Sequence, residues 1–273
     1  MLNLFMAKDN PMAELLKWYL DSGVDCFLDN TPCNRLIDRP VRQNSPPTIR
    51  AAKGNTEIKK KDSSRELISR EASFETAQKT ANASTSLEEL KAAISNFEGC
   101  PLKFTAKNLV FGSGAENPGL MIIGEAPGAE EDRQGLPFVG RAGQLLDKML
   151  NSIDLTRDLV YITNILPWRP PGNRPPTDTE ISACLPFIRR QILLVKPKIL
   201  IMLGGTSAKT LLGTTDGIMR LRGRWTEYAS EELSSPIIAR ALLHPAFLLR
   251  QPEQKRETWL DLLEIKAKLQ SLR

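Results

Sequence analysis

The chain contains 273 residues, carries a net charge of +5 and has a single histidine, His244. One imidazole excludes a metal centre with several histidine ligands, and a Ser-His-Asp or Cys-His site would have to be built around this residue. With 41% hydrophobic and 25% charged residues, the composition is typical of a globular protein that can bury a full core. The length fits one large domain with an appendage.

The four cysteines are irregularly spaced along the chain, at Cys26, Cys33, Cys100 and Cys184. This spacing argues against a disulfide framework and for a reducing compartment. The first residues lack the charged and apolar regions of a secretory signal, and the apolar runs are too short to cross a bilayer. We therefore expect a cytoplasmic protein with no membrane association.

The first 85 residues are predicted to hold one short helix followed by a linker. Residues 11–22 place Leu15, Leu16, Tyr19 and Leu20 on one helical face, which predicts a helical segment within residues 1–37. Residues 38–85 are rich in Ser, Thr, Pro and charged side chains and poor in aliphatic ones. Such a stretch buries too little apolar surface to offset the entropy of ordering, so we predict a mostly disordered linker.

Residues 86–273 are predicted to form an α/β domain. A capping box of Ser86 and Glu89 opens a helix that ends at about Phe97. Helical stretches such as residues 139–153 and 179–195 then alternate with four apolar runs, at residues 120–123, 159–165, 199–203 and 237–243. This alternation is typical of a parallel sheet covered on both faces. We predict a three-layer α/β/α fold with a central, mainly parallel four-stranded sheet.

Polar and glycine-rich segments follow the predicted strands. The first strand leads into residues 124–128, the second ends at Asn164, and the third and fourth are followed by Gly204 and His244. Ligands of open α/β sheets bind at the carboxyl ends of the strands, so the single histidine lies at the expected binding edge. Neither a G-x-G-x-x-G nor a P-loop spacing is present, which disfavours dinucleotide binding and nucleotide hydrolysis.

Two features of the second part of the chain favour a polyanionic ligand. All of the net charge lies in residues 99–273, and residues 165–224 hold 10 basic against 3 acidic side chains, an excess that attracts phosphates. Gly204, Thr206 and Ser207 lie where a helix N-terminus could bind a phosphate. The alternatives are a solvated surface and an ordinary glycine-rich turn with a Thr or Ser cap.

Four motifs occur in order within about residues 99–265. They are the run from Gly124 to Leu146, with Pro-Phe-Val-Gly around Phe138, then Thr163-Asn164, Pro170-Pro-Gly-Asn-Arg174, and His244-Pro-Ala-Phe-Leu-Leu-Arg250. Together they closely resemble the family 4 uracil-DNA glycosylases, of the uracil-DNA glycosylase superfamily. The resemblance implies the fold of that superfamily and a role in base excision repair of DNA.

The resemblance implies a pocket for a base flipped out of the duplex, an event that costs a few kcal/mol. In it, Phe138 stacks on uracil and Asn164 pairs with the O4 and N3 edge, since an asparagine amide can donate and accept at once. Gly124 and Ala126 complete the substrate-binding residues. Without the motifs, Phe138 could be a core aromatic and Asn164 a turn residue.

The resemblance also implies two catalytic residues. His244 stabilises the negative charge that develops on uracil O2, an effect that a single donor supplies at about 3 kcal/mol in other enzymes. Glu125 orients or activates the attacking water. The structural alternatives are a histidine that only ends a strand and a glutamate that caps the next loop. No lysine stands at a motif position to form a Schiff base, so we expect no lyase activity.

The segment after His244 matches the minor-groove loop of the family. In that loop an apolar side chain fills the space left by the flipped base. The candidates for this role are Phe247 and Leu248. Arg250 and the loop of Gly204, Thr206 and Ser207 are expected to contact the DNA backbone.

Family 4 members typically hold a four-iron, four-sulfur cluster on four cysteines. In this chain the four positions read Cys100, Lys103, Trp168 and Cys184, and neither Lys nor Trp replaces a thiolate. Cys26 and Cys33 could replace them only from across the linker, and their spacing argues against it. We expect no cluster, an indole that fills its volume, and two neighbouring cysteines that stay free or form a bridge.

We therefore expect a monomeric, monofunctional glycosylase that removes uracil from uracil-containing DNA and leaves an abasic site. The alternative is a non-catalytic DNA-binding or partner-docking protein on the same fold, with the N-terminal helix as the element that docks on a protein partner. The intact set of Glu125, Phe138, Asn164 and His244 favours the enzyme. The branch of the superfamily that crosslinks to DNA needs an additional histidine, which this chain lacks.

Overall fold

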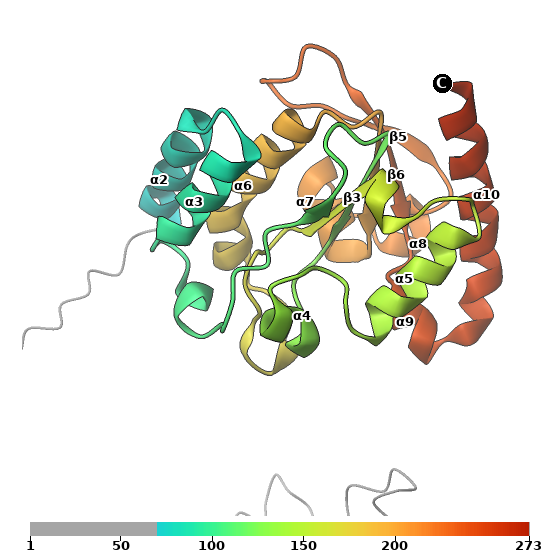
Figure 1. The fold of residues 1–273 in the computed structure, drawn as a ribbon, viewed down its shortest axis with the longest axis horizontal. Helices are drawn as coiled ribbons and strands as arrows, with labels where there is room; N and C mark the ends of the chain where they lie inside the picture. Colours follow the sequence, from blue (N-terminus) through green and yellow to red (C-terminus); the bar gives the residue numbers. More distant parts are fainter. Residues whose placement is uncertain (1–69, 273) are drawn as a thin grey trace, which may run out of the picture. The chain divides into compact units, whose positions relative to one another are not determined.

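The computed structural model describes residues 70–272, and the predicted helix at residues 11–22 lies outside this part of the chain. A sheet forms its centre, with helices around it (Figure 1). This sheet has six strands in the order β1-β3-β2-β4-β6-β5. The middle strands are parallel and comprise β3 (Val160–Asn164), β2 (Leu120–Gly124), β4 (Ile199–Leu203) and β6 (Ile237–Leu242). The predicted central four-stranded parallel sheet is confirmed.

Two short antiparallel strands extend this sheet at its edges. β1 (Ser113–Gly114) pairs with β3, and β5 (Trp225–Tyr228) pairs with β6. Sequence patterns did not predict either strand, because β1 is only two residues long and β5 is not a continuous apolar run.

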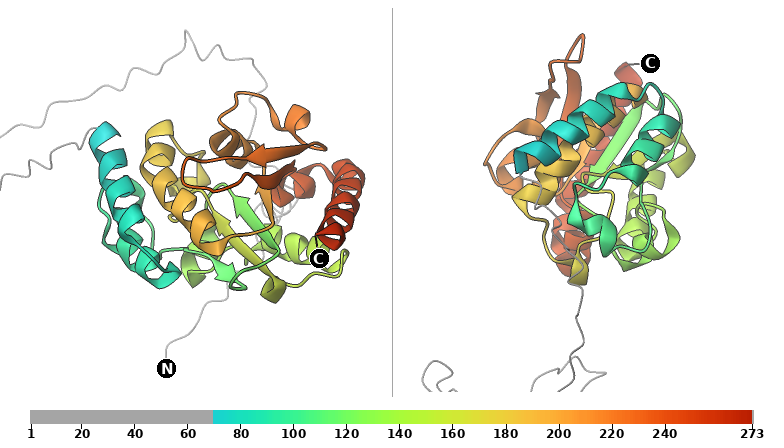
Figure 2. Two further views of the ribbon diagram at one scale, coloured as in Figure 1. Left: turned by 90° about the horizontal axis from the view of Figure 1, so that it is seen from above. Right: turned by 90° about the vertical axis from the view of Figure 1, so that its left-hand side faces the viewer.

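Helices cover both faces of the sheet and give the predicted three layers (Figure 2). α5 (Arg141–Asn151), α9 (Pro245–Arg250) and α10 (Lys255–Ser271) pack on one face, and α6 (Asp178–Val195) and α7 (Gly205–Leu212) pack on the other. In β2, Leu120 and Ile122 belong to the first core, whereas Met121 and Ile123 belong to the second. Successive side chains of a strand point to opposite faces, so a strand buried on both sides is apolar throughout.

Short helices occupy several connections between these elements. α4 (Ala129–Gln134) lies between β2 and α5, and α8 (Ile218–Leu221) precedes β5. Single 3₁₀ turns occur at η1 (Pro101–Phe104), η2 (Arg157–Leu159), η3 (Pro171–Asn173) and η4 (Pro252–Gln254). Within residues 70–272, none of the helices combines the length and the apolar character that crossing a membrane requires.

Two N-terminal helices, α2 (Arg70–Ala83) and α3 (Leu87–Asn96), pack beside α6. The hydroxyl of Ser86 accepts a hydrogen bond from the Glu89 N–H at 3.2 Å, so the predicted N-cap is confirmed. The prediction of a linker over residues 38–85 is wrong for residues 70–83, which form α2. Its buried face includes the small side chains of Ala77 and Ala81, and such a face leaves only a weak hydrophobic pattern in the sequence.

A third apolar cluster joins α2, α3, η1 and α6. Its aromatic centre pairs Phe97 with Phe187, whose ring centroids lie 5.0 Å apart in an edge-to-face arrangement. Trp168, Cys100 and Cys184 complete the buried interior of this cluster. The region in which the family resemblance places a metal cluster is therefore a hydrophobic core in this chain.

Candidate active site

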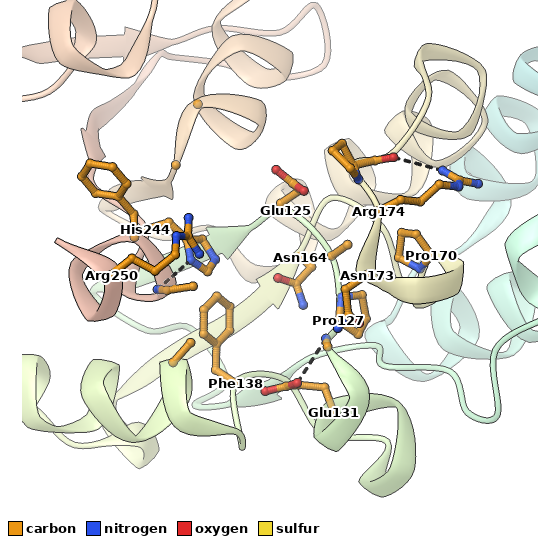
Figure 3. A pocket seen from close by; sticks show the side chains of 18 residues that line it. Glu125, Pro127, Glu131, Phe138, Asn164, Pro170, Asn173, Arg174, His244 and Arg250 are labelled. Atoms are coloured by element: carbon orange, nitrogen blue, oxygen red, sulfur yellow. Dashed lines mark hydrogen bonds between the residues drawn. The ribbon is translucent and has the colours of Figure 1, made fainter. Parts of the chain in front are cut away.

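A cavity of about 520 Å³ opens at the carboxyl ends of the parallel strands (Figure 3). The segments that follow β2, β3, β4 and β6 all contribute to its lining, and so does the loop before α5. The structure thus brings together five residues that the sequence predicted for the site, Glu125, Ala126, Phe138, Asn164 and His244. We refer to this space as the base cavity, after the flipped base that the family resemblance implies as its occupant.

One wall of the base cavity is formed by Phe138 and His244. Their ring centroids lie 5.7 Å apart with an interplanar angle of 32°. Gly124 lies beneath Phe138, where a Cβ atom would meet the Oδ1 atom of Asn164 at 2.4 Å and the Cζ atom of Phe138 at 2.5 Å. Any side chain at this position would displace Asn164 and Phe138, so the absence of a Cβ atom on Gly124 is part of the shape of the cavity.

Asn164 supplies the polar edge of the base cavity. Its side chain is 4% exposed, and its Oδ1 atom has no hydrogen-bond partner among the described residues. An unpaired buried carbonyl oxygen costs free energy of about 1–3 kcal/mol. A ligand that carries an N–H group at this point would satisfy the oxygen, whereas a ligand with a lone pair there would be rejected.

His244 is held in one orientation and one tautomer. It is the N-cap of α9, and its Nδ1 atom accepts a hydrogen bond from the Ala246 N–H at 3.1 Å. Burial, together with the smaller effect of the positive charge of Arg250, lowers the pKa of His244 from 6.5 to about 4, and the charge of Glu131 opposes this shift. The imidazole is therefore neutral at pH 7, and its proton lies on Nε2, where it can be donated to a ligand.

Two carboxylates line the base cavity, and the sequence predicted only one of them. Glu125 follows β2 and is partly exposed, with its side chain among those that line the space (Figure 3). Glu131 is buried and accepts hydrogen bonds from the backbone N–H groups of Gly128, Val139 and Gly140 at 3.1, 2.9 and 2.8 Å. Glu131 therefore holds the loop before α5 against the N-terminus of α4.

The predicted DNA-contact residues divide into two groups. Gly204, Phe247 and Arg250 line the base cavity, and Thr206 lies in the first turn of α7. Ser207 is fully buried and its hydroxyl donates to the Ile123 carbonyl at 2.7 Å, while Leu248 is 1% exposed within the core under α9. These two positions contradict direct DNA contact, because both side chains already belong to the interior of the protein.

The residues at the four cluster positions do not fit an iron-sulfur cluster. Cys100 and Cys184 are free and buried, and the indole of Trp168 lies in the same apolar cluster with 3% exposure. The pKa of the Cys184 thiol is raised well above its usual value, because it shares a hydrogen bond with Cys100 and is completely buried. Within residues 70–272, no three His, Cys, Asp or Glu side chains gather as a metal site. Two thiols cannot supply the four ligands that such a cluster needs.

The fold and the base cavity define an α/β protein with an aromatic- and amide-lined pocket at the carboxyl ends of a parallel sheet. Residues 111–264 match the family model of the uracil DNA glycosylase superfamily. The chain is 41% identical over 185 residues to a type-4 uracil-DNA glycosylase of Pyrobaculum aerophilum. This match covers 64% of the present chain and 91% of the P. aerophilum protein. Corresponding proteins of Archaeoglobus fulgidus and Thermotoga maritima are 38% identical over 184 residues and 35% identical over 165 residues.

The match to the A. fulgidus protein covers 66% of this chain and 92% of that protein. The match to the T. maritima protein covers 60% of this chain and 83% of that protein. The chain therefore belongs to the uracil-DNA glycosylase superfamily, and within it to family 4.

Proposed function

We propose that this protein is a monofunctional DNA repair glycosylase that hydrolyses the N-glycosidic bond of uracil in DNA. The unpaired Oδ1 atom of Asn164, buried between Phe138 and Glu125 in the base cavity, is the observation that carries the proposal. The names of the family 4 relatives support the same reaction and substrate.

Recognition of uracil follows from the two sides of the cavity. The ring of Phe138 offers a face on which a flipped base stacks, a contact worth about 1–3 kcal/mol per base. The Oδ1 atom of Asn164 accepts the N3–H of uracil, and its Nδ2 atom donates to O4. Cytosine presents a lone pair at N3 and an amino group at C4, so it leaves both amide groups unsatisfied. The site therefore discriminates between the two pyrimidines.

Bond cleavage leaves negative charge on the departing uracil and positive charge on the sugar. The neutral imidazole of His244 donates its Nε2–H to uracil O2 as that oxygen gains charge, so the bond strengthens toward the transition state. Its hydrogen bond from Ala246 fixes the tautomer that this step requires. Glu125 lines the cavity, is partly exposed, and orients the water that attacks the sugar. The water becomes the new hydroxyl of the abasic site, and its proton leaves through the carboxylate.

DNA is held at the rim of the base cavity. Arg250 offers a charge, and the first turn of α7 with Thr206 offers backbone N–H groups to phosphates, whereas the N–H of Gly204 already donates to the Leu242 carbonyl at 2.9 Å. Phe247 is partly exposed and lines the cavity, so it fills the gap left by the flipped base in place of the buried Leu248.

The test is the single-turnover rate of uracil release from an oligonucleotide with one uracil, beside the same strand with cytosine. The wild type should release uracil and leave cytosine. His244→Ala and Asn164→Ala should each lower the rate by about a hundredfold or more, whereas Asn151→Ala, at an exposed position on α5, should not. An inactive wild type that still binds the DNA would establish the non-catalytic alternative instead.

We further propose that this family 4 member works without an iron-sulfur cluster. The buried indole of Trp168 and the side chain of Lys103 at two ligand positions support this proposal. Iron and acid-labile sulfide should both be absent from protein purified anaerobically. A matched variant, Lys103→Cys with Trp168→Cys, restores four thiols and should take up iron on reconstitution. Stoichiometric iron with a visible charge-transfer band in the wild type would refute the proposal.

The organisation outside the glycosylase domain is also a proposal. We infer a monomer in the cytoplasm, whose residues 1–37 dock on a protein partner and whose glycosylase domain begins with α2 rather than at residue 86. The free, buried thiols of Cys100 and Cys184 support the cytoplasmic location, because that compartment is reducing. The apolar pattern of residues 11–22 supports the docking on a protein partner. Light scattering of the full chain tests the monomer, and a dimer at micromolar concentration would contradict it.

A further inference from the structure

The loop that carries Phe138 has a backbone conformation that its own residues do not favour. Phe138 has a φ of +53°, in the left-handed region that side chains with a Cβ atom adopt at a cost of about 1–3 kcal/mol. Its carbonyl lies so close to α5 that a Cβ atom on Gly143 would be 1.7 Å from the carbonyl oxygen. The stacking ring therefore needs external contacts that hold its backbone in place.

Arg157 supplies such contacts from η2, nineteen residues further along the chain. Its Nη1 atom donates to the Pro137 carbonyl at 3.1 Å, and its Nη2 atom donates to the Phe138 carbonyl. Its Nε atom donates to the Oδ1 atom of Asp147 on α5 at 2.6 Å. One rigid guanidinium thus joins the loop to the helix that follows it.

The two ends of the loop are held by opposite kinds of group. Arg157 binds the carbonyls of Pro137 and Phe138, while Glu131 accepts the N–H groups of Val139 and Gly140. The side chains of Arg157 and Asp147 are 29% and 39% exposed, and an ion pair of this exposure adds little stability. The main effect of the Arg157–Asp147 pair is therefore to fix the position of the guanidinium, and with it the backbone of the Phe138 loop.

We propose that Arg157, anchored by Asp147, is a positioning residue that holds the strained Phe138 backbone so that its ring can stack on uracil. The inference rests on the proposed function of the base cavity. A lysine at this position cannot bind two carbonyls and a carboxylate with one planar group, because its ammonium is a point charge on a flexible stem. Positioning, rather than charge, is thus what the guanidinium provides.

The experiment is a double-mutant cycle between Arg157 and Phe138. Arg157→Lys and Arg157→Ala are each made in the wild type and in Phe138→Ala. Two quantities are measured for every variant, the single-turnover rate of uracil release at saturating DNA and the inhibition constant of free uracil. Lys266→Ala serves as control, because it removes another cation from an ion pair with a carboxylate, that of Asp154.

We expect both Arg157 variants to lower the rate and weaken uracil binding by about ten- to a hundredfold, since misplacement of a binding group by 1 Å can cost that much. In the Phe138→Ala background the same changes should have less than a twofold effect, because the ring that Arg157 positions is gone. The control should match the wild type. Should Arg157→Ala fail to fold, Arg157→Lys carries the cycle, with folding checked by circular dichroism.

Equal losses in both backgrounds would overturn the inference, because they would show that Arg157 supports the fold in general. Unchanged rates and uracil binding in the wild-type background would overturn it as well. A wild type that releases no uracil would instead remove the proposed function, so the two failures are distinguishable.

Discussion

The base cavity and the region around Cys100, Lys103, Trp168 and Cys184, which we call the cysteine region, lie in one domain and agree to different degrees with the pattern that the family resemblance implies. In the base cavity, the chain keeps Glu125, Phe138, Asn164 and His244 of the family pattern. In the cysteine region, half of the pattern is replaced, and the space is filled by an indole and neighbouring apolar side chains.

The difference follows from what each region must do. Excision needs a few polar atoms at fixed positions, and a substitute of the same volume cannot supply a lone pair or an N–H group in the same place. A structural region needs its volume filled and its buried polar groups satisfied, and apolar packing can meet both demands. We therefore expect substitutions in the cysteine region to change stability, and substitutions in the base cavity to change the rate.

Trp168→Ala should give the largest effect on stability. The indole is 3% exposed within the third apolar cluster, and truncation of a buried tryptophan costs about 3–5 kcal/mol of unfolding free energy. Urea unfolding measures this loss. The rate of uracil release, measured under conditions in which the variant is folded, should stay within about twofold of the wild type. A hundredfold loss of rate with little loss of stability would contradict a purely structural role of the cysteine region.

Gly124→Ala should lower the rate of uracil release and leave the stability nearly unchanged, the opposite of Trp168→Ala. The added Cβ atom would press on the Asn164 Oδ1 atom and the Phe138 ring, so we expect a rate about a hundredfold lower with a small change in unfolding free energy. Gly217→Ala is the matched control, because nothing lies within 4 Å of a Cβ atom there. Wild-type activity in Gly124→Ala would mean that uracil does not occupy this space.

The charge state of His244 can be measured directly, because the chain has only one histidine. Nuclear magnetic resonance of protein with nitrogen-15 histidine should show the Nε2–H tautomer at pH 7 and a pKa of about 4. A pKa lowered from 6.5 means that folding favours the neutral form. This contribution to stability is present above pH 6.5 and is lost as the pH falls to about 4. Titration near pH 6.5 in the folded protein would contradict a neutral donor at this position.

Cys100→Ala should have the smallest effect. The thiol contributes apolar packing in the cysteine region, so we expect a loss of about 1 kcal/mol in unfolding free energy and no change in the rate of uracil release. Ile94→Val, in the same cluster, provides a packing control of similar size. A large loss of activity in Cys100→Ala alone would show that the cysteine region contributes more than volume.

The sequence predicted the features that depend on strong local patterns. The strand at Ile199–Leu203 was predicted with its observed bounds, because a fully buried parallel strand is apolar throughout. The order of the strand ends placed Asn164 and His244 at one edge. α2 was missed, because a helix that packs through alanine has little hydrophobic contrast.

Other features depend on contacts between distant residues. No local pattern marks Glu131 as the acceptor of the Val139 and Gly140 N–H groups, or Arg157 as the donor to the Phe138 carbonyl. Which of the two predicted candidates, Phe247 or Leu248, stays accessible is likewise set by the face of α9 that packs on the core, and the motif alone does not specify that face. The one available signal for Glu131 was its position three residues after Gly128, the N-cap of α4.

The central claim is that the base cavity alone performs the excision, with no contribution from a metal cluster in the cysteine region. The most direct measurement is the single-turnover rate of uracil release by protein purified without oxygen, with iron quantified in the same sample. We predict release of uracil from a sample that contains no iron. Release confined to fractions that carry stoichiometric iron, with none from iron-free protein, would contradict it.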